Sequence, residues 1–237
     1  MKDNMNKFVK AIKRHNMISD GDVVAVGLSG GKDSLLLLKY LVNYQKFSEQ
    51  KFEIIAITID MGFKGSNFSK LQEYTKELGV KYEIVKSDIA QVLFEIRKEK
   101  NPCSLCAKLR RGILCSTAKE MGATKLALGH HSDDLIETFF LSMIFEGRLS
   151  TFQPVSLMER AEITVIRPII YFDEDDVKKE SASLPVFKNP CPADKYTKRE
   201  EIKTKIKELQ SLCPKSKNNI YRAIVNPDRY NLWRNDK

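Results

Sequence analysis

The stretch from Val23 to Ser34, which reads VVAVGLSGGKDS, decides the fold. Residues 23–27 form an apolar, β-branched run of the kind that makes a buried strand. The polar residues at its end open the periodic segment 35–44, which predicts a helix. A glycine-rich bend between a buried strand and a helix lies at the carboxyl end of the strand, where open α/β sheets bind ligands.

The bend has the composition of an anion-binding site. Two glycines let the backbone approach a ligand, and the helix that follows adds partial positive charge at its N-terminus. The groups that would contact an anion are Ser29, Gly30, Gly31, Lys32 and Ser34. The bend is not a Walker A loop, because Val26 stands where that motif needs its first glycine and Asp33 stands where it needs Ser or Thr. The alternative is a tight turn that only joins the strand to the helix.

The rest of the chain alternates between strand and helix patterns. Strands are predicted at residues 23–27, 53–60, 81–85, 125–128 and 164–166, and helices at 8–17, 35–44, 67–78, 88–98, 106–121, 133–145 and 198–209, with a break at Asn101. This alternation predicts an α/β fold, a mostly parallel Rossmann-like sheet with helices on both faces. We expect an N-terminal helix over residues 1–20, a main domain over 21–190 and a small basic C-terminal extension over 191–237, which carries the only tryptophan, Trp233.

Composition and charge narrow the class of protein. With 42% hydrophobic and 30% charged residues, the chain of 237 residues is an ordinary globular one rather than a disordered one. Forty Lys and Arg against 31 Asp and Glu give a net charge of +9, and a surplus of six lies in residues 198–237. This surplus favours a polyanionic partner or an anionic substrate. The alternative is a basic surface that is merely solvated.

The sequence also argues for a cytoplasmic location and against a membrane. The first 17 residues are basic but contain no uninterrupted apolar run, so we expect no secretory signal. No stretch approaches the roughly 18–20 apolar residues of a membrane span. Five cysteines, an odd number in a mid-sized chain, favour a reducing compartment over a disulfide framework.

Acidic residues follow two further predicted strands. The segment 129–134, GHHSDD, places Asp133 and Asp134 after the strand at 125–128. Together with Asp33 these carboxylates suit Mg²⁺, which prefers carboxylate and phosphate oxygens; the alternative is that they only cap a helix. Asp60 ends the strand at 53–60 and either contacts a ligand or caps its own loop.

The cysteines contain one short-spaced pair. Cys103 and Cys106 form a CxxC at a predicted helix start, where nearby basic residues are expected to lower the thiol pKa values. The pair is compatible with a redox dithiol, half of a zinc site or part of an iron–sulfur site. Cys191 stands between two prolines in a loop that would present its thiol, Cys115 is expected in the core, and Cys213 is assigned no role.

Two of these segments resemble a known superfamily. Residues 29–34, SGGKDS, match the signature of the PP-loop ATP-pyrophosphatases, and residues 129–138 are similar to a second motif of these families. The resemblance implies a fold of the adenine nucleotide α hydrolase type and cleavage of ATP to AMP and pyrophosphate. It implies nucleotide contacts from Ser29, Gly30, Gly31, Lys32, Asp33, Ser34, Asp60, Gly129, His130 and Asp134.

A narrower resemblance includes the cysteines. PCSLCAKLRRGIL (102–114), LGHHSDDLIETFF (128–140), VIRPI (165–169) and the late Cys191 are similar to the tRNA 2-thiocytidine synthetase family. The resemblance implies a [4Fe-4S] cluster on Cys103, Cys106 and Cys191, together with ATP and Mg²⁺, in an enzyme that thiolates a cytidine of the tRNA anticodon loop.

We therefore expect a tRNA sulfurtransferase that adenylates the base oxygen and then replaces it by sulfur. The expected catalytic residues are Cys103, Cys106, Cys191 and Asp33, with RNA on Arg110, Arg111 and the basic C-terminal residues. The expected partners are tRNA, a sulfur donor (inorganic sulfide or sulfur from a cysteine desulfurase) and a second copy in a homodimer. The alternatives are action on another nucleoside, an amidating ligase without a cluster, a desulfurase, or a non-catalytic zinc-containing nucleic-acid-binding module.

Overall fold

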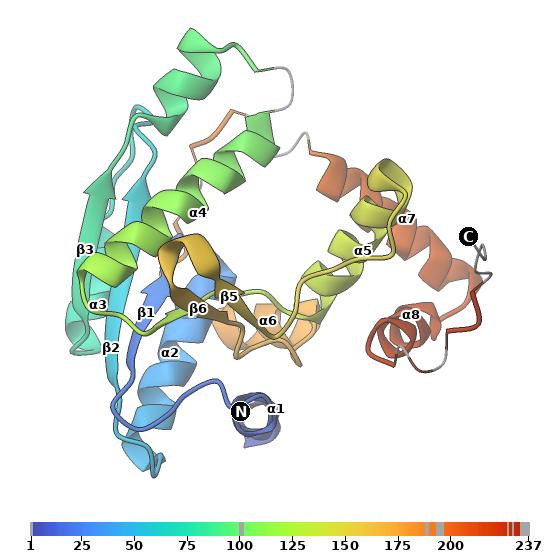
Figure 1. Cartoon of the computed structure of the whole chain (residues 1–237), viewed down its shortest axis with the longest axis horizontal. Helices are drawn as coiled ribbons and strands as arrows, with labels where there is room; N and C mark the ends of the chain where they lie inside the picture. The colour runs from blue at the N-terminus through green and yellow to red at the C-terminus, as the bar shows by residue number, and fades with distance from the viewer. Residues whose placement is uncertain are drawn as a thin grey trace. The chain divides into compact units, whose positions relative to one another are not determined.

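A computed structural model of the chain describes residues 2–99, 102–187, 190–192, 197–226, 228 and 230–232. The expected helix break at Asn101 and the only tryptophan, Trp233, lie outside these residues. In the described part, six strands form one sheet in the order β3-β2-β1-β4-β6-β5 (Figure 1). All neighbouring pairs are parallel except β5 with β6, which is antiparallel.

The strands are β1 (Val23–Gly27), β2 (Glu53–Asp60), β3 (Lys81–Lys86), β4 (Lys125–Ala127), β5 (Val155–Met158) and β6 (Ile163–Ile166). The helices are α1 (Lys2–Arg14), α2 (Lys32–Phe47), α3 (Ser69–Glu77), α4 (Pro102–Glu120), α5 (Ser132–Glu146), α6 (Glu174–Ser181), α7 (Lys198–Leu212) and α8 (Ser216–Ile224). Two short segments complete the set: η1, a π-helix over Gln91–Ile96, and η2, a 3-10 helix over Glu159–Ala161.

The chain divides into two compact units. The first comprises residues 1–131 and 153–195 and contains the whole sheet; the second comprises residues 132–152 and 196–237 and contains α5, α7 and α8. The expected domains at 1–20, 21–190 and 191–237 remain a prediction, since the compact units are drawn along other boundaries.

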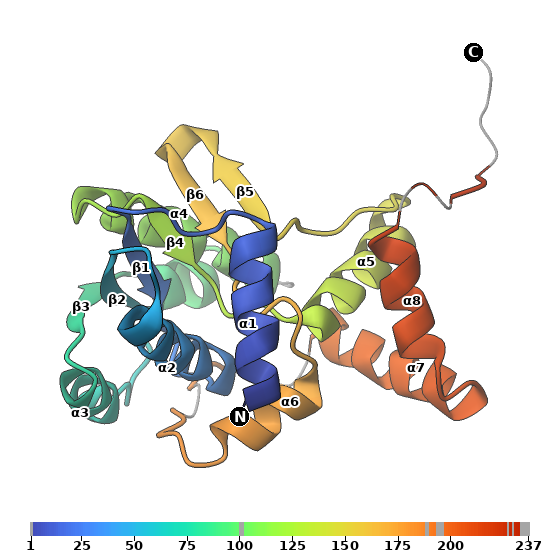
Figure 2. The same cartoon turned by 90° about the horizontal axis from the view of Figure 1, so that it is seen from below.

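Side chains alternate between the two faces of the sheet in the first unit. Ala25, Ile57, Leu126 and Val165 pack with Leu114 and neighbouring residues of α4 in one buried cluster. The strand residues between them point to the opposite face, where α2 lies against β1 and β2 with its buried leucines (Figure 2). Helices therefore cover both faces of a mostly parallel sheet, which confirms the predicted fold class.

Three elements in the described chain have no counterpart in the sequence-based prediction: β5, α6 and α8. β5 pairs antiparallel with β6 through the tight turn at η2, where Glu162 adopts a left-handed conformation with φ 49°. α6 starts at a capping box in which Asp173 and Asp176 each accept from the other's backbone N–H. β5 has only four residues and α6 only one apolar residue, Val177, so neither carries a clear hydrophobic period. α8 is amphipathic but only nine residues long.

The second unit is helical. Ile136 of α5 and Ile202 and Ile206 of α7 form its buried core, and residues of α8 pack against them. None of the helices in the described residues is long and apolar enough to cross a membrane.

Helix α1 gives a test of the packing in the first unit. The ring of Phe8 is fully buried and lies 5.4 Å from the ring of Tyr40 and 5.9 Å from that of Tyr44 on α2. We expect Phe8→Ala to lower the free energy of unfolding by about 3–5 kcal/mol, because it leaves a cavity among these rings. Urea titration measures the change.

Lys10→Ala on the exposed side of the same helix is the matched control, and it should change this free energy by less than about 0.5 kcal/mol. Equal stability of Phe8→Ala and the wild type would show that α1 does not contribute to the core.

Candidate active site

The glycine-rich bend joins β1 to α2 at the carboxyl end of the strand. Gly30 has φ +80°, a left-handed conformation that favours glycine. The Ser34 hydroxyl accepts from the backbone N–H of Ser29 and donates to the carbonyl of Gly31, so the bend is closed on itself. α2 begins at Lys32, and its N-cap, Gly31, provides no side-chain hydrogen bond. The N–H groups of the first turn are therefore left for an anion to bind.

Gly30 also makes room for a residue far along the chain. A Cβ at this position would lie 2.7 Å from Cβ of Phe187, whose backbone N–H donates to the Gly30 carbonyl at 2.8 Å. The Phe187 ring lies 5.5 Å from that of Phe68. Phe187 is therefore anchored on the bend itself.

A second glycine brings the end of β4 against the bend. A Cβ at Gly129 would lie 2.9 Å from the backbone carbonyl group of Asp33 and 3.1 Å from the backbone nitrogen of Ser34. Only glycine permits this approach, which places the next residues, His130 and His131, beside the first turn of α2. His131 is 3% exposed, whereas His130 is partly exposed.

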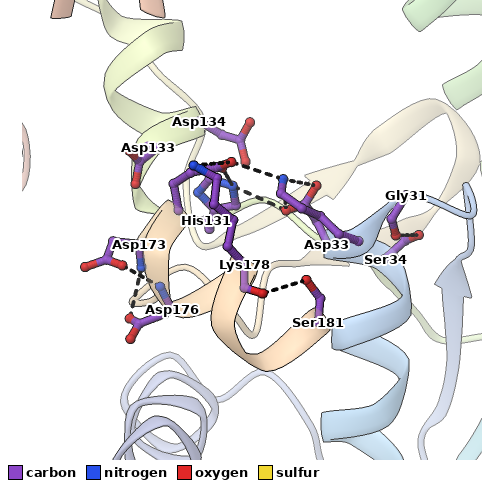
Figure 3. A network of polar contacts seen from close by, with 12 residues as sticks. Gly31, Asp33, Ser34, His131, Asp133, Asp134, Asp173, Asp176, Lys178 and Ser181 are labelled. Carbon is purple, nitrogen blue, oxygen red and sulfur yellow. Dashed lines mark hydrogen bonds and ion pairs between the residues drawn. The ribbon is translucent and has the colours of Figure 1, made fainter. Parts of the chain in front are cut away.

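His131 lies beside Asp33 in a polar network (Figure 3), to which Lys32 and Glu174 also belong. His131 Nε2 lies 3.4 Å from Asp33 Oδ1 and 3.2 Å from Glu174 Oε2. Lys32 Nζ lies 3.0 Å from Asp33 Oδ1 and 3.4 Å from Glu174 Oε1. One ligand atom each from Asp33, His131 and Glu174 lies within 4.8 Å of the others. Among the described residues, these three side chains are therefore placed to hold a metal ion.

The network stabilises its charged forms. The hydrogen bond with His131, followed by the charge of Lys32, lowers the pKa of Glu174 to about 2. Burial raises the pKa of Asp33, but the hydrogen bond with His131 and the charge of Lys32 outweigh it and lower the pKa overall. Burial lowers the pKa of Lys32, yet Asp33 and Glu174 raise it overall. Both carboxylates and the ammonium group are therefore charged near neutral pH.

The acidic start of α5 is held by basic residues within the second unit. Arg199 Nη1 donates to Asp134 Oδ1 at 3.2 Å and to Glu137 Oε2 at 2.9 Å. Lys217 forms an ion pair with Asp133. The magnesium role expected for Asp33, Asp133 and Asp134 stays a prediction, and within each unit these carboxylates have basic partners.

The three candidate cluster cysteines all belong to the first unit. Burial raises the pKa of the Cys106 thiol; Arg110 lowers it, and charge on Cys191 and on Cys103 raises it further. Cys106 is therefore electrostatically coupled to each of the other two cysteines. The expected fall in thiol pKa is wrong for Cys106, because burial and the two neighbouring thiols outweigh Arg110. Cys106 also contacts the sulfur of Met61 at 3.6 Å, next to the end of β2.

The other candidates have local partners. Asp60 accepts from the backbone N–H of Gly62 at 3.0 Å and so caps its own loop. Cys115 is buried in the core, as predicted. Cys213 is exposed in the second unit.

Sequence reasoning missed Glu174, Phe187 and Arg199. Asp173 and Asp176 around Glu174 have the spacing of a capping box, a signal that would have predicted the start of α6. Nothing in the local sequence distinguishes Phe187 or Arg199, since their contacts are with residues more than 60 positions away.

Comparison with known proteins shows the family to which the chain belongs. A PP-loop domain matches residues 1–209. A tRNA-cytidine(32) 2-sulfurtransferase of Pseudomonas putida (strain GB-1) is 41% identical over 94% of this chain and 86% of its own length. One of Vibrio vulnificus (strain CMCP6) is 40% identical over 94% and 76%. This chain belongs to the PP-loop tRNA-cytidine(32) 2-sulfurtransferase family.

Two solved structures have a fold similar to that of this chain. The U34-tRNA thiolase NcsA from Methanococcus maripaludis, solved with its [4Fe-4S] cluster, has a TM-score of 0.77 and 29% identity, and the match covers 97% of this chain and 79% of that one. The NH3-dependent NAD synthetase from Campylobacter jejuni subsp. jejuni NCTC 11168 has a TM-score of 0.50 and 18% identity over 99% and 98% of the two chains, and at this identity it shares the fold alone.

Alanine substitutions at two glycines of the sulfurtransferase separate the effect of backbone strain from that of a steric clash. We expect Gly30→Ala to lower the free energy of unfolding by about 1 kcal/mol more than Gly122→Ala. Both glycines have φ near +80°, but a Cβ at Gly122 meets nothing within 4 Å, whereas one at Gly30 displaces Phe187. Urea titration of both variants measures the difference, and equal losses would contradict the contact.

A second prediction concerns Glu137. Burial raises its pKa to about 7, and neighbouring basic residues only partly oppose this. The raised pKa means that the folded state favours the protonated form. The stability that this contributes is complete below about pH 4.5 and is lost as the pH rises to about 7. Glu137→Gln removes this titration. Between pH 4.5 and 7.5 the wild type should therefore lose about 3 kcal/mol of its free energy of unfolding relative to the variant.

Glu201→Gln, on the exposed side of α7, is the control and should keep the pH dependence of the wild type. A constant difference between Glu137→Gln and the wild type across this pH range would refute the buried, protonated carboxyl.

Proposed function

We propose that this chain is an ATP-dependent tRNA sulfurtransferase that converts a cytidine of the anticodon loop to 2-thiocytidine through an adenylated base. The observation that carries the proposal is that one compact unit contains both a bend suited to phosphate and three cysteines, of which Cys106 is electrostatically coupled to Cys103 and Cys191. The family named for 2-thiolation of tRNA cytidine supports the choice of substrate.

The three thiols fit an iron–sulfur cluster. Cys103 and Cys106 lie one helical turn apart at the start of α4, and the charge of Cys191 acts on the Cys106 thiol. Three cysteine ligands on four irons leave one iron for another ligand. A bound [4Fe-4S] cluster would supply the sulfur-binding position, and the thiolase NcsA contains such a cluster.

The bend supports the first step. The first-turn N–H groups of α2, with Ser29 and Lys32, would hold the β and γ phosphates of ATP, while O2 of the cytosine attacks the α phosphorus. Pyrophosphate leaves, and O2 becomes part of a good leaving group. Sulfide sulfur then forms a bond to C2, the C2–O bond breaks, and the oxygen departs within AMP.

The basic surface supports RNA as the partner. Arg110 and Arg111 are exposed on α4 in the first unit. Residues 198–237 carry the surplus of six positive charges. A base in an unpaired loop can be turned outward at low cost, and phosphate contacts make such binding sensitive to salt.

Further parts of the proposal concern cofactor and setting. Mg²⁺ would accompany ATP near Asp33, and sulfur would come from inorganic sulfide or a cysteine desulfurase. We assign the reaction to the cytoplasm, where tRNA resides and thiols stay reduced. A homodimer stays a prediction.

The alternatives explain less. An amidating ligase has no use for three coupled thiols, and a non-catalytic zinc module leaves the phosphate-binding bend without a role. A desulfurase would not need the ATP site.

The test is anaerobic reconstitution with iron and sulfide, followed by reaction with ATP and unmodified tRNA. We expect AMP and pyrophosphate in amounts equal to the 2-thiocytidine found by mass spectrometry of digested tRNA. Formation of ADP, or of an amidated nucleoside, would contradict the proposal.

The cysteines are tested in the same assay. Cys103→Ala, Cys106→Ala and Cys191→Ala should each lose the four-iron absorbance and at least about 100-fold of the thiolation rate, since each removes a cluster ligand. Cys213→Ala, which changes an exposed cysteine outside the group, should retain both. A full cluster and full thiolation in Cys103→Ala would refute the assignment.

A further inference from the structure

The group of Asp33, His131 and Glu174 has the shape of a metal site built from distant segments. Asp33 lies in the first turn of α2, His131 follows β4, and Glu174 is the first residue of α6. Their ligand atoms lie within 4.8 Å of one another, and the imidazole is 3% exposed (Figure 3). A buried imidazole beside two carboxylates is a donor set that first-row divalent cations favour.

A cationic group of the protein already lies between these carboxylates. Lys32 Nζ is 3.0 Å from Asp33 Oδ1 and 3.4 Å from Glu174 Oε1. Its single charge offsets part of the repulsion between two carboxylates held this close. If the ammonium group moved away, two negative charges and an imidazole nitrogen would remain together, which is the charge that a divalent cation neutralises.

Lys32 is the residue of this group that a nucleotide would move. It belongs to the bend, and its flexible side chain has four methylene groups. A triphosphate at the first turn of α2 carries more negative charge than the two carboxylates and would attract the ammonium group. The ammonium group of Lys32 would then leave the two carboxylates, and a divalent cation could bind them in its place.

We propose that Asp33, His131 and Glu174 form a divalent-cation site whose place is held by the ammonium group of Lys32 until nucleotide phosphates draw the lysine away. The proposal rests on the proposed use of ATP and adds to it two ligands, His131 and Glu174, and an order of events. Because binding free energies are reciprocal, the cation must tighten nucleotide binding by the factor by which the nucleotide tightens cation binding.

The first experiment removes the lysine. Mn²⁺ is titrated into the full-length protein without nucleotide, and free Mn²⁺ is followed by electron paramagnetic resonance. Lys32→Met should bind Mn²⁺ at least about tenfold more tightly than the wild type, because the competing charge is gone. Lys32→Arg, which keeps the charge, should show no gain.

Lys178→Met is the matched control, because Lys178 also contacts Glu174, at 3.6 Å, but from an exposed position. It should change Mn²⁺ affinity by less than about threefold, the size expected of a solvated pair. The double variant Lys32→Met/Glu174→Gln should lose the gain. No gain in Lys32→Met, or a gain that survives Glu174→Gln, overturns the proposal.

The second experiment identifies the imidazole. Wild-type protein labelled with ¹⁵N-histidine is loaded with Mn²⁺ and a non-hydrolysable ATP analogue, and pulsed electron paramagnetic resonance should show ¹⁵N coupling that His131→Gln loses. Absence of this coupling overturns the role of His131.

These outcomes are separable from those of the proposed function. Release of AMP and pyrophosphate without any gain of Mn²⁺ affinity in Lys32→Met defeats only the cation site. A gain of affinity in a protein that never cleaves ATP leaves the cation site and defeats the function.

Discussion

The missing side chain at Gly30 is the constraint on which the site depends. Its φ of +80° turns the chain from β1 into α2, and the same open position receives Phe187, whose backbone N–H donates to the Gly30 carbonyl. One glycine therefore shapes the bend that we propose binds phosphate and also anchors Phe187. A side chain here would disturb the bend and the contact with Phe187 at once, although the two are far apart in the sequence.

Within each unit, acidic side chains are paired with basic ones. Lys32 lies between Asp33 and Glu174 in the first unit, and Arg199 joins Asp134 to Glu137 in the second. Such pairs contribute little stability when exposed but order the side chains when partly buried. Under the proposed function, RNA would therefore be attracted by exposed groups such as Arg110 and Arg111 and by the basic C-terminal residues.

The sequence predicted the parts of the site that are local. The bend, the carboxyl ends of β1 and β4 and the core position of Cys115 follow from strand and helix patterns over a few residues, and the fold class follows from their alternation. Glu174, Phe187 and Arg199 were out of reach, because their roles arise from contacts across more than 60 residues. β5 and α8 were missed because they are short, and α6 because it has only one apolar residue. α5 belongs to the second compact unit, although its sequence is typical of a crossover helix.

We propose that the bend binds the departing pyrophosphate while the base oxygen O2 attacks the α phosphorus of ATP. Isotope tracing tests it most directly: unmodified tRNA with oxygen-18 at O2 of its cytidines is converted with ATP, and the AMP is weighed by mass spectrometry. If O2 attacks the α phosphorus, we expect one oxygen-18 in the AMP released for each 2-thiocytidine formed. Unlabelled AMP accompanying 2-thiocytidine would contradict it.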